Sequence, residues 1–323
     1  MGNPDVFELN FFCALEAKQL ARLFEDRFVL DDLKSLGAGV SLAVMDFSNE
    51  RAKTVQLLNK LDIPVIAWLM LPKEENYWFN LSNSVLAAEQ YHRFKQWSQH
   101  KKLVWAGIGL SIKENTAWKN ASKAADLNSE QLLQAKQNYK QLAEQVQADG
   151  YQLELYRSAV IETPERGRLK FLRKAESQLA LLADRQVALL FSSLHRGQSQ
   201  AALWRALAGA QAIGIGLTGS SVLFEDMDQA DPLTWEEFTQ ELRIGAQSGK
   251  PVYVFSLEGC ARLGYLDRLV TFDLYAPVDT LPAKERYSQR KRDWRSPQRL
   301  ASLATLIGIL GGTLFFLRRK KSR

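Results

Sequence analysis

The stretch LVWAGIGLSIKEN, at residues 103–115, decides the fold of this chain. Its even-numbered positions from Val104 to Ile112 are apolar, and from Gly107 onward Gly109, Ser111 and Lys113 alternate with them. This alternation has a period of two residues and predicts a β-strand. The aliphatic face suits packing beneath helices, whereas the glycine face that ends at Ser111 and Lys113 suits the interior of a closed sheet with a polar mouth. An edge strand with both polar residues in solvent is the alternative.

Similar strand-like runs alternate with helix-like segments over most of the chain. The strand-like runs are 7–12, 40–45, 64–71, 103–113, 151–158, 186–193, 212–218 and 251–258. The helix-like segments are 16–36, 49–61, 84–99, 129–149, 169–182, 200–208, 235–247 and 264–269. Such alternation predicts βαβ units and a parallel sheet. Eight units in roughly 280 residues favour a closed (β/α)8 TIM barrel, with an open doubly wound sheet as the runner-up.

Composition and charge describe an ordinary globular protein with an unusual end. The 323 residues are 46% hydrophobic and 24% charged, and the formal net charge is +6. Residues 284–323 hold twelve Lys and Arg but only two acidic residues, so the rest of the chain carries a mildly acidic −4. Because the positive charge is local, it indicates contact with anionic lipid rather than a nucleic-acid surface.

Residues 300–317, LASLATLIGILGGTLFFL, hold no charge and are followed by RRKKSR. A helix needs ~20 apolar residues to cross a bilayer, with a range of ~17–25, and flanking basic side chains extend a short span. We therefore predict a barrel over 1–278, a basic linker over 279–299, a transmembrane helix over 300–317 and a basic tail over 318–323. A buried helix of a soluble domain is the alternative. Gly308 and Gly312 form a small-xxx-small pair that would support a weak homodimer.

The N-terminal residues show no basic and apolar pattern of a cleavable signal. A large domain ahead of the only predicted span then has no evident route across the membrane. The expected topology is a single-pass protein with a C-terminal anchor and a cytoplasmic barrel.

In a barrel of this kind, active sites lie at the carboxyl ends of the strands. On the fifth strand we expect Glu154 and Tyr156 to face inward, and on the eighth Ser256 and Glu258, with Tyr253, Phe255 and Leu257 toward the helices. The catalytic candidates are Glu154 and Glu258. The ligand-binding candidates are Ser111, Lys113, Tyr156, Asp46 and Trp78, the last from the aromatic run NYWFN. Other polar residues at strand ends are Glu8, Asn10, His195 and Thr218.

Two contacts follow from this arrangement. The Lys113 ammonium should pair with an interior carboxylate, Glu154 on the neighbouring strand, because an unpaired buried charge is costly. Cys13 and Cys260 should lie near one another, because strands one and eight become neighbours on closure. We expect no metal and no cofactor. The GIGLTG run at 214–219 matches a dinucleotide motif, but it lies inside the seventh strand and precedes an acidic loop instead of a helix.

Four segments resemble an uncharacterised family of bacterial TIM-barrel proteins related to glycoside hydrolases and, more distantly, chitinase-like barrels. These segments are PVIAWLML with NYWFNLSN, AGIGL, QAIGIGLTG and VYVFSLEG. In such families the fourth strand ends in Gly-Leu-Asp-Ile-Glu, whose carboxylates support acid catalysis. Ser111 and Lys113 occupy those positions here, so the resemblance implies that the acid pair is lost.

Three hypotheses follow. The first is a membrane-anchored, glycosidase-like barrel that binds a carbohydrate-like small molecule or a protein partner without hydrolysis. The second is an active carbohydrate hydrolase that uses relocated carboxylates, Glu154 and Glu258. The third is Schiff-base chemistry at Lys113, since a desolvated lysine can act as a nucleophile.

Overall fold

The computed structural model describes residues 7–112, 129–158, 182–195, 209–219 and 231–278. Residues up to Val278 form one compact unit. The predicted linker, membrane helix and tail lie outside the described residues and stay predictions. No helix within the described ranges is long and apolar enough to cross a membrane.

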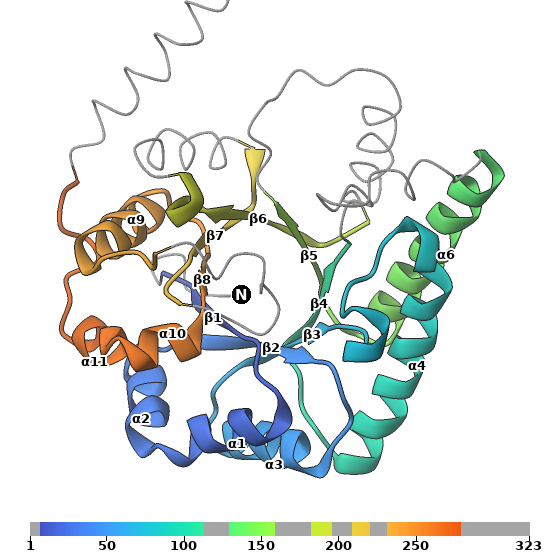
Figure 1. The fold of residues 1–323 in the computed structure, drawn as a ribbon, viewed down its shortest axis with the longest axis horizontal. Helices are drawn as coiled ribbons and strands as arrows, with labels where there is room; N and C mark the ends of the chain where they lie inside the picture. Colours follow the sequence, from blue (N-terminus) through green and yellow to red (C-terminus); the bar gives the residue numbers. More distant parts are fainter. Residues whose placement is uncertain (1–6, 113–128, 159–181, 196–208, 220–230, 279–323) are drawn as a thin grey trace, which may run out of the picture. The chain divides into compact units, whose positions relative to one another are not determined.

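The described strands form a closed parallel barrel in sequence order (Figure 1). They are β1 (Leu9–Cys13), β2 (Gly39–Val44), β3 (Val65–Leu69), β4 (Gly107–Ser111), β5 (Leu153–Ser158), β6 (Arg185–Phe191), β7 (Ala212–Gly216) and β8 (Val252–Phe255). Closure occurs where β1 pairs with β8, with Leu9 opposite Val252 and Phe12 opposite Phe255. The TIM barrel predicted from the alternation is confirmed, and the doubly wound sheet is wrong.

Helices surround this ring in Figure 1. They are α1 (Ala17–Glu25), α2 (Arg27–Ser35), α3 (Asn49–Lys60), α4 (Ser84–Lys101), α6 (Ser129–Ala148), α9 (Trp235–Gln247), α10 (Leu257–Arg262) and α11 (Tyr265–Val270), with short 3-10 turns η1 (Lys73–Glu75), η2 (Leu81–Asn83) and η3 (Ser192–His195). The single helix predicted over 16–36 is two helices, because Asp26 has extended backbone and its carboxylate accepts a hydrogen bond from the Phe28 N–H. The helices predicted over 169–182 and 200–208 lie outside the described residues, apart from Leu182.

The deciding strand has the predicted two faces. Ile108 and Leu110 belong to the core between sheet and helices, and Gly109 lies against the Tyr156 ring in the barrel interior. The strand is shorter than predicted, since Val104 precedes it and is 67% exposed. Gly109 is required here because a Cβ at this position would overlap the Tyr156 ring.

A second core fills the barrel itself and is rich in aromatic rings. Phe12 lies 5.0 Å from Trp68, 4.9 Å from Tyr156 and 5.6 Å from Tyr253, measured between ring centroids. Tyr253 and Phe255 belong to this interior core, so the prediction that they face the helices is wrong. All four residues of VYVF are apolar or aromatic, so the sequence offers no contrast that assigns the two faces. Filling the barrel favours the larger rings inside.

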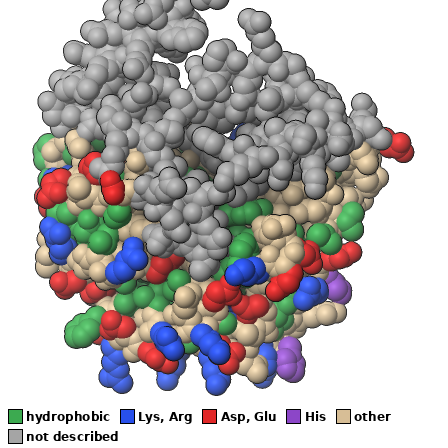
Figure 2. Space-filling model, in the orientation of Figure 1, with side chains coloured by type: hydrophobic (Ala, Val, Ile, Leu, Met, Phe, Trp, Pro, Cys, Tyr) green, Lys and Arg blue, Asp and Glu red, His purple; other side chains and the backbone are tan. Residues whose placement is uncertain are grey.

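The described surface carries both signs of charge. Figure 2 shows Lys and Arg interspersed with Asp and Glu over the face that it draws. Exposed pairs such as Lys140 and Glu144, one helical turn apart on α6, are part of this mixture. Such pairs contribute little to stability.

Candidate functional site

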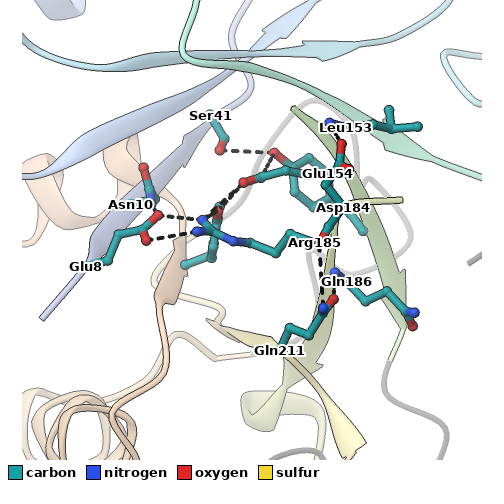
Figure 3. Close-up of polar contacts among 11 residues, drawn as sticks. Glu8, Asn10, Ser41, Leu153, Glu154, Asp184, Arg185, Gln186 and Gln211 are labelled. Atoms are coloured by element: carbon teal, nitrogen blue, oxygen red, sulfur yellow. Dashed lines mark hydrogen bonds and ion pairs between the residues drawn. The ribbon is translucent and has the colours of Figure 1, made fainter. Parts of the chain in front are cut away.

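Glu154 lies at the centre of a buried polar network (Figure 3). Its carboxylate accepts hydrogen bonds from the Tyr253 hydroxyl at 2.7 Å and the Tyr156 hydroxyl at 3.0 Å, and forms an ion pair with Arg185 at 3.2 Å. Arg185 also donates to Glu8 with both terminal nitrogens. Both carboxylate oxygens of Glu154 therefore accept hydrogen bonds from within the protein.

This network lies at the amino-terminal end of the barrel. Glu8 precedes β1, Arg185 begins β6, and Glu154 and Tyr253 are the second residues of β5 and β8. Ser41, early in β2, extends the network through its hydroxyl, 3.2 Å from that of Tyr156. The inward orientation predicted for Glu154 is correct, but its predicted place at the carboxyl-end mouth is wrong. β5 is only six residues long and has polar residues near both ends. The sequence does not tell at which end of the barrel each of these side chains finds its partners.

The electrostatics of the network are those of a structural ion pair. Burial raises the pKa of Glu154, while the Tyr253 hydroxyl and the Arg185 charge oppose that rise. Burial and the negative charge of Glu154 also raise the pKa of the Tyr253 hydroxyl. A buried, hydrogen-bonded carboxylate of this kind stabilises a closed arrangement and offers no free oxygen to a ligand.

Glu258 has a different environment. It was predicted to end the eighth strand, but β8 ends at Phe255 and Ser256 caps α10, so Glu258 lies in the first turn of that helix. Both carboxylate oxygens are buried and form no well-aligned hydrogen bond with the described part of the chain. Burial raises the pKa of Glu258 to about 7, and the nearby Ser256 hydroxyl, Ala14 N–H and Cys13 thiol oppose that rise.

The two catalytic candidates do not form a pair. Glu154 is the second residue of β5, at the amino-terminal end of the barrel, whereas Glu258 follows β8 at the carboxyl end. The two carboxylates share no neighbour among their contacts. A glycosidase needs two carboxyl groups that flank the same bond. Glu154 and Glu258 lack that arrangement.

Asp46 follows β2 at the mouth of the barrel, and its carboxylate is bound by neighbouring residues of the same chain. It forms a 2.7 Å ion pair with Arg51, whose guanidinium is fully buried, and accepts a 2.9 Å hydrogen bond from the Ser48 N–H. Arg51 also donates to backbone carbonyl oxygens of Ala43 and Leu15. Although burial acts in the opposite direction, the Arg51 hydrogen bond and charge hold the pKa of Asp46 below its ordinary value. Asp46 therefore positions Arg51, which joins the ends of β1 and β2.

Aromatic and hydroxyl groups form the interior wall near the mouth. The Trp68 indole N–H donates to the Ser111 hydroxyl at 3.1 Å, and Trp78 lies over Trp68 at 6.1 Å between ring centroids. Trp78 is half-buried, whereas Trp68 and Ser111 are buried. Tyr156 contacts Trp68 edge-on from below. The structure thus brings together three of the predicted ligand-binding residues, Ser111, Tyr156 and Trp78.

One predicted residue and the side chain of another lie outside the described part of the chain. Lys113 lies outside the described residues, so its pairing stays untested, although the described partner of Glu154 is Arg185. The side chain of His195 is likewise outside them. Cys13 ends β1 and Cys260 lies on α10, which follows β8; both are buried free thiols, and the charge of Glu258 raises the pKa of both in addition to burial. Their predicted proximity stays a prediction.

Sequence reasoning missed Arg185 as an interior residue. Arg185 begins a strand, and its side chain reaches across the barrel to Glu8. Its only signal was one basic residue at the start of an apolar run. Among the described residues there is no group of three His, Cys, Asp or Glu side chains placed to hold a metal ion.

No protein-family model matches the sequence, and no curated protein matches it. Solved structures match in fold. The C-terminal domain of a candidate chitinase from Desulfitobacterium hafniense DCB-2 has a TM-score of 0.53 at 9% identity, covering 82% of this chain and 97% of that chain. A 3-keto-D-glucoside 4-epimerase from E. coli has a TM-score of 0.47 at 12% identity, covering 81% and 97%. A D-allulose 3-epimerase from Methylomonas sp. has a TM-score of 0.46 at 12% identity, covering 90% and 100%. At such identity the likeness shows the TIM-barrel fold alone.

Proposed function

We propose that this chain is a glycosidase-like barrel that binds a carbohydrate-like ligand at its mouth without cleaving it. The observation that carries the proposal is the place of Glu154 at the amino-terminal end, where Arg185 and two tyrosines engage its carboxylate. Without Glu154, the described part of the mouth lacks the pair of Glu154 and Glu258 that the hydrolase hypothesis requires. Ser111 at the end of β4 supplies no acid in its place.

The mouth retains groups that suit binding. Trp78 offers a half-buried ring over Trp68, and an indole face stacks well on a flat apolar face of a sugar. The Ser111 hydroxyl, held by the Trp68 indole, adds a polar group beside the rings. The fold shared with a candidate chitinase domain makes a carbohydrate the first ligand class to test, ahead of a protein partner.

The test combines binding and turnover on the full-length chain in detergent. Titration with an oligosaccharide panel should give binding that Trp78→Ala weakens about tenfold, the effect of losing ~1.4 kcal/mol. Trp235→Ala, on the outer helix α9, is the matched control and should bind normally. Chromogenic glycosides should not be cleaved. Cleavage that Glu258→Gln abolishes would establish the hydrolase instead.

A double substitution tests whether only the acid pair was lost. Ser111→Asp with Lys113→Glu recreates the family pattern at the end of the fourth strand. Measurable glycoside cleavage by this variant would show that the mouth still binds a glycosidic bond in a reactive position. A folded variant that binds sugar but stays inactive would support the binding role alone.

We also propose that residues 300–317 anchor the protein and that the linker over 279–299 lies on anionic lipid. The support is the uncharged run and the seven basic residues between 284 and 299. Deleting 300–323 should move the protein from the membrane to the soluble fraction. Protease should not digest the barrel in intact spheroplasts, and digestion there would contradict the cytoplasmic placement.

A further inference from the structure

The connection between β3 and α4 crosses the mouth with unusual backbone geometry. Asn76 and Tyr77 have consecutive positive φ values of 61° and 62°. Asparagine tolerates this left-handed region, but a tyrosine adopts it at a cost because its Cβ crowds the backbone. Such a conformation persists only where surrounding contacts hold it.

One side-chain contact of Tyr77 crosses the end of the barrel, in addition to its backbone hydrogen bonds with Leu71 and Pro72. Its hydroxyl donates a 3.2 Å hydrogen bond to the Glu16 carboxylate, which follows β1 two strands away. Glu16 occupies the N-cap position of α1, a fully described helix, yet its side chain does not cap that helix. The carboxylate of Glu16 is therefore available for this contact across the barrel end.

The other end of the connection is fixed. Phe79 forms a parallel bridge with Ile112, the Asn83 amide donates to the Trp78 carbonyl oxygen at 2.9 Å, and the Tyr139 hydroxyl donates to the Asn80 carbonyl oxygen at 2.7 Å. Four residues, 73–76, are exposed between the anchored side and β3. Residues 78–80 are therefore anchored by several hydrogen bonds, whereas the preceding part of the connection is tied across the barrel through the Tyr77 hydroxyl.

Beneath this segment lies the aromatic wall of the mouth. Trp78 covers Trp68, which is only 1% exposed, and Trp68 holds the Ser111 hydroxyl. Tyr77 and Trp78 both pack against this interior core, so a movement of Tyr77 that turns the Trp78 ring would remove part of its cover. The strained backbone of Tyr77 would relax in the same movement.

We propose that residues 73–78 form a strap that closes the mouth, with the hydrogen bond from Tyr77 to Glu16 as its latch. The structure shows the latched state. Release of the latch opens the strap about the anchored backbone of Trp78, Phe79 and Asn80, turns the Trp78 ring away from Trp68 and admits a ligand to the wall of Trp68 and Ser111. The strap is a property of the ligand-free chain, so it stands or falls separately from the identity of the ligand.

Hydrogen exchange of the full-length chain tests the latch. Tyr77→Phe removes only the hydroxyl and should speed exchange of the Leu71 N–H, which bonds the Tyr77 carbonyl oxygen, by about fivefold, the effect of one lost hydrogen bond. Glu16→Gln keeps an acceptor and should exchange more slowly than Glu16→Ala. Tyr275→Phe, at an exposed tyrosine remote from the mouth, is the matched control. Unchanged exchange in Tyr77→Phe, or faster exchange spread over β1 and β8, would overturn the proposal.

Thiol labelling tests what the strap covers. A maleimide should react slowly with Ser111→Cys and about fivefold faster when Tyr77→Phe is added. Cys13 and Cys260 are buried and serve as internal controls that should stay unlabelled. Equal labelling rates with and without the Tyr77 hydroxyl would show that the strap does not cover Ser111.

Discussion

The two ends of the barrel each hold a buried carboxylate, but the two carboxylates differ in their hydrogen-bond partners. At the amino-terminal end, Glu154 has Arg185, Tyr156 and Tyr253 as direct partners. At the carboxyl end, Glu258 is buried with no well-aligned hydrogen bond to a described residue. Burial raises the pKa of both groups; Arg185 and Tyr253 oppose the rise at Glu154, and the pKa of Glu258 reaches about 7.

This difference separates stability from function. Satisfied polar networks rigidify a core, and breaking one is costly because the remaining partner stays buried and unpaired. A poorly satisfied carboxyl weakens the fold and titrates at physiological pH, which is the pattern found where a protein trades stability for a role. The amino-terminal end closes the barrel, and the carboxyl end holds the candidate site.

The largest effect should come from Arg185→Met. Removing the guanidinium leaves Glu154 and Glu8 without their ion pair, and breaking a mostly buried pair of this kind costs about 3–5 kcal/mol. Urea denaturation measures the loss. Lys140→Met, which breaks an exposed pair on α6, is the control and should cost less than ~0.5 kcal/mol. Equal effects of the two substitutions would remove the distinction between the ends.

Gly109→Ala should rank second. The added Cβ would overlap the Tyr156 ring, and Tyr156 cannot move without disturbing its hydrogen bonds to Glu154 and Ser41. Overpacking at such a position costs about 2–3 kcal/mol. Gly209→Ala, where a Cβ meets no atom within 4 Å, is the matched control. A thermal scan in which both variants melt together would mean that the interior is loosely packed.

Glu258→Gln should give a smaller effect of opposite sign. The folded pKa of about 7 exceeds the unfolded value of ~4.3, so the folded chain holds a proton that the unfolded chain has released between these pH values. Stability is therefore fully present below pH ~4 and declines as pH rises toward 7. Glutamine stays neutral, so the variant should gain about 1–2 kcal/mol at pH 8 and almost nothing at pH 4.

The matched substitution Glu154→Gln sharpens the comparison. It removes one member of the ion pair with Arg185 and should destabilise the chain at pH 8, where Glu258→Gln stabilises it. Denaturation of both variants at the two pH values gives the sign of each effect. A loss of stability in Glu258→Gln at pH 8 would show that its carboxylate is well satisfied after all.

The sequence by itself determined the barrel and the faces of most strands. Period-two alternation at residues 103–112 separated Ile108 and Leu110 from Gly109, and the same contrast turned Glu154 and Tyr156 inward. The alternation did not assign the two faces of β8, because all four residues of VYVF are apolar or aromatic. The barrel interior selected Tyr253 and Phe255 by volume.

Only the tertiary structure decided which residues act together. The partners of Glu154 come from β6 and β8, 31 and 99 residues away, and the latch of Tyr77 to Glu16 spans 61 residues. Local pattern records the face of a strand but not the end of the barrel at which a side chain finds its partner. That choice depends on strand length, on register and on where each strand begins, which are set when the eight strands close.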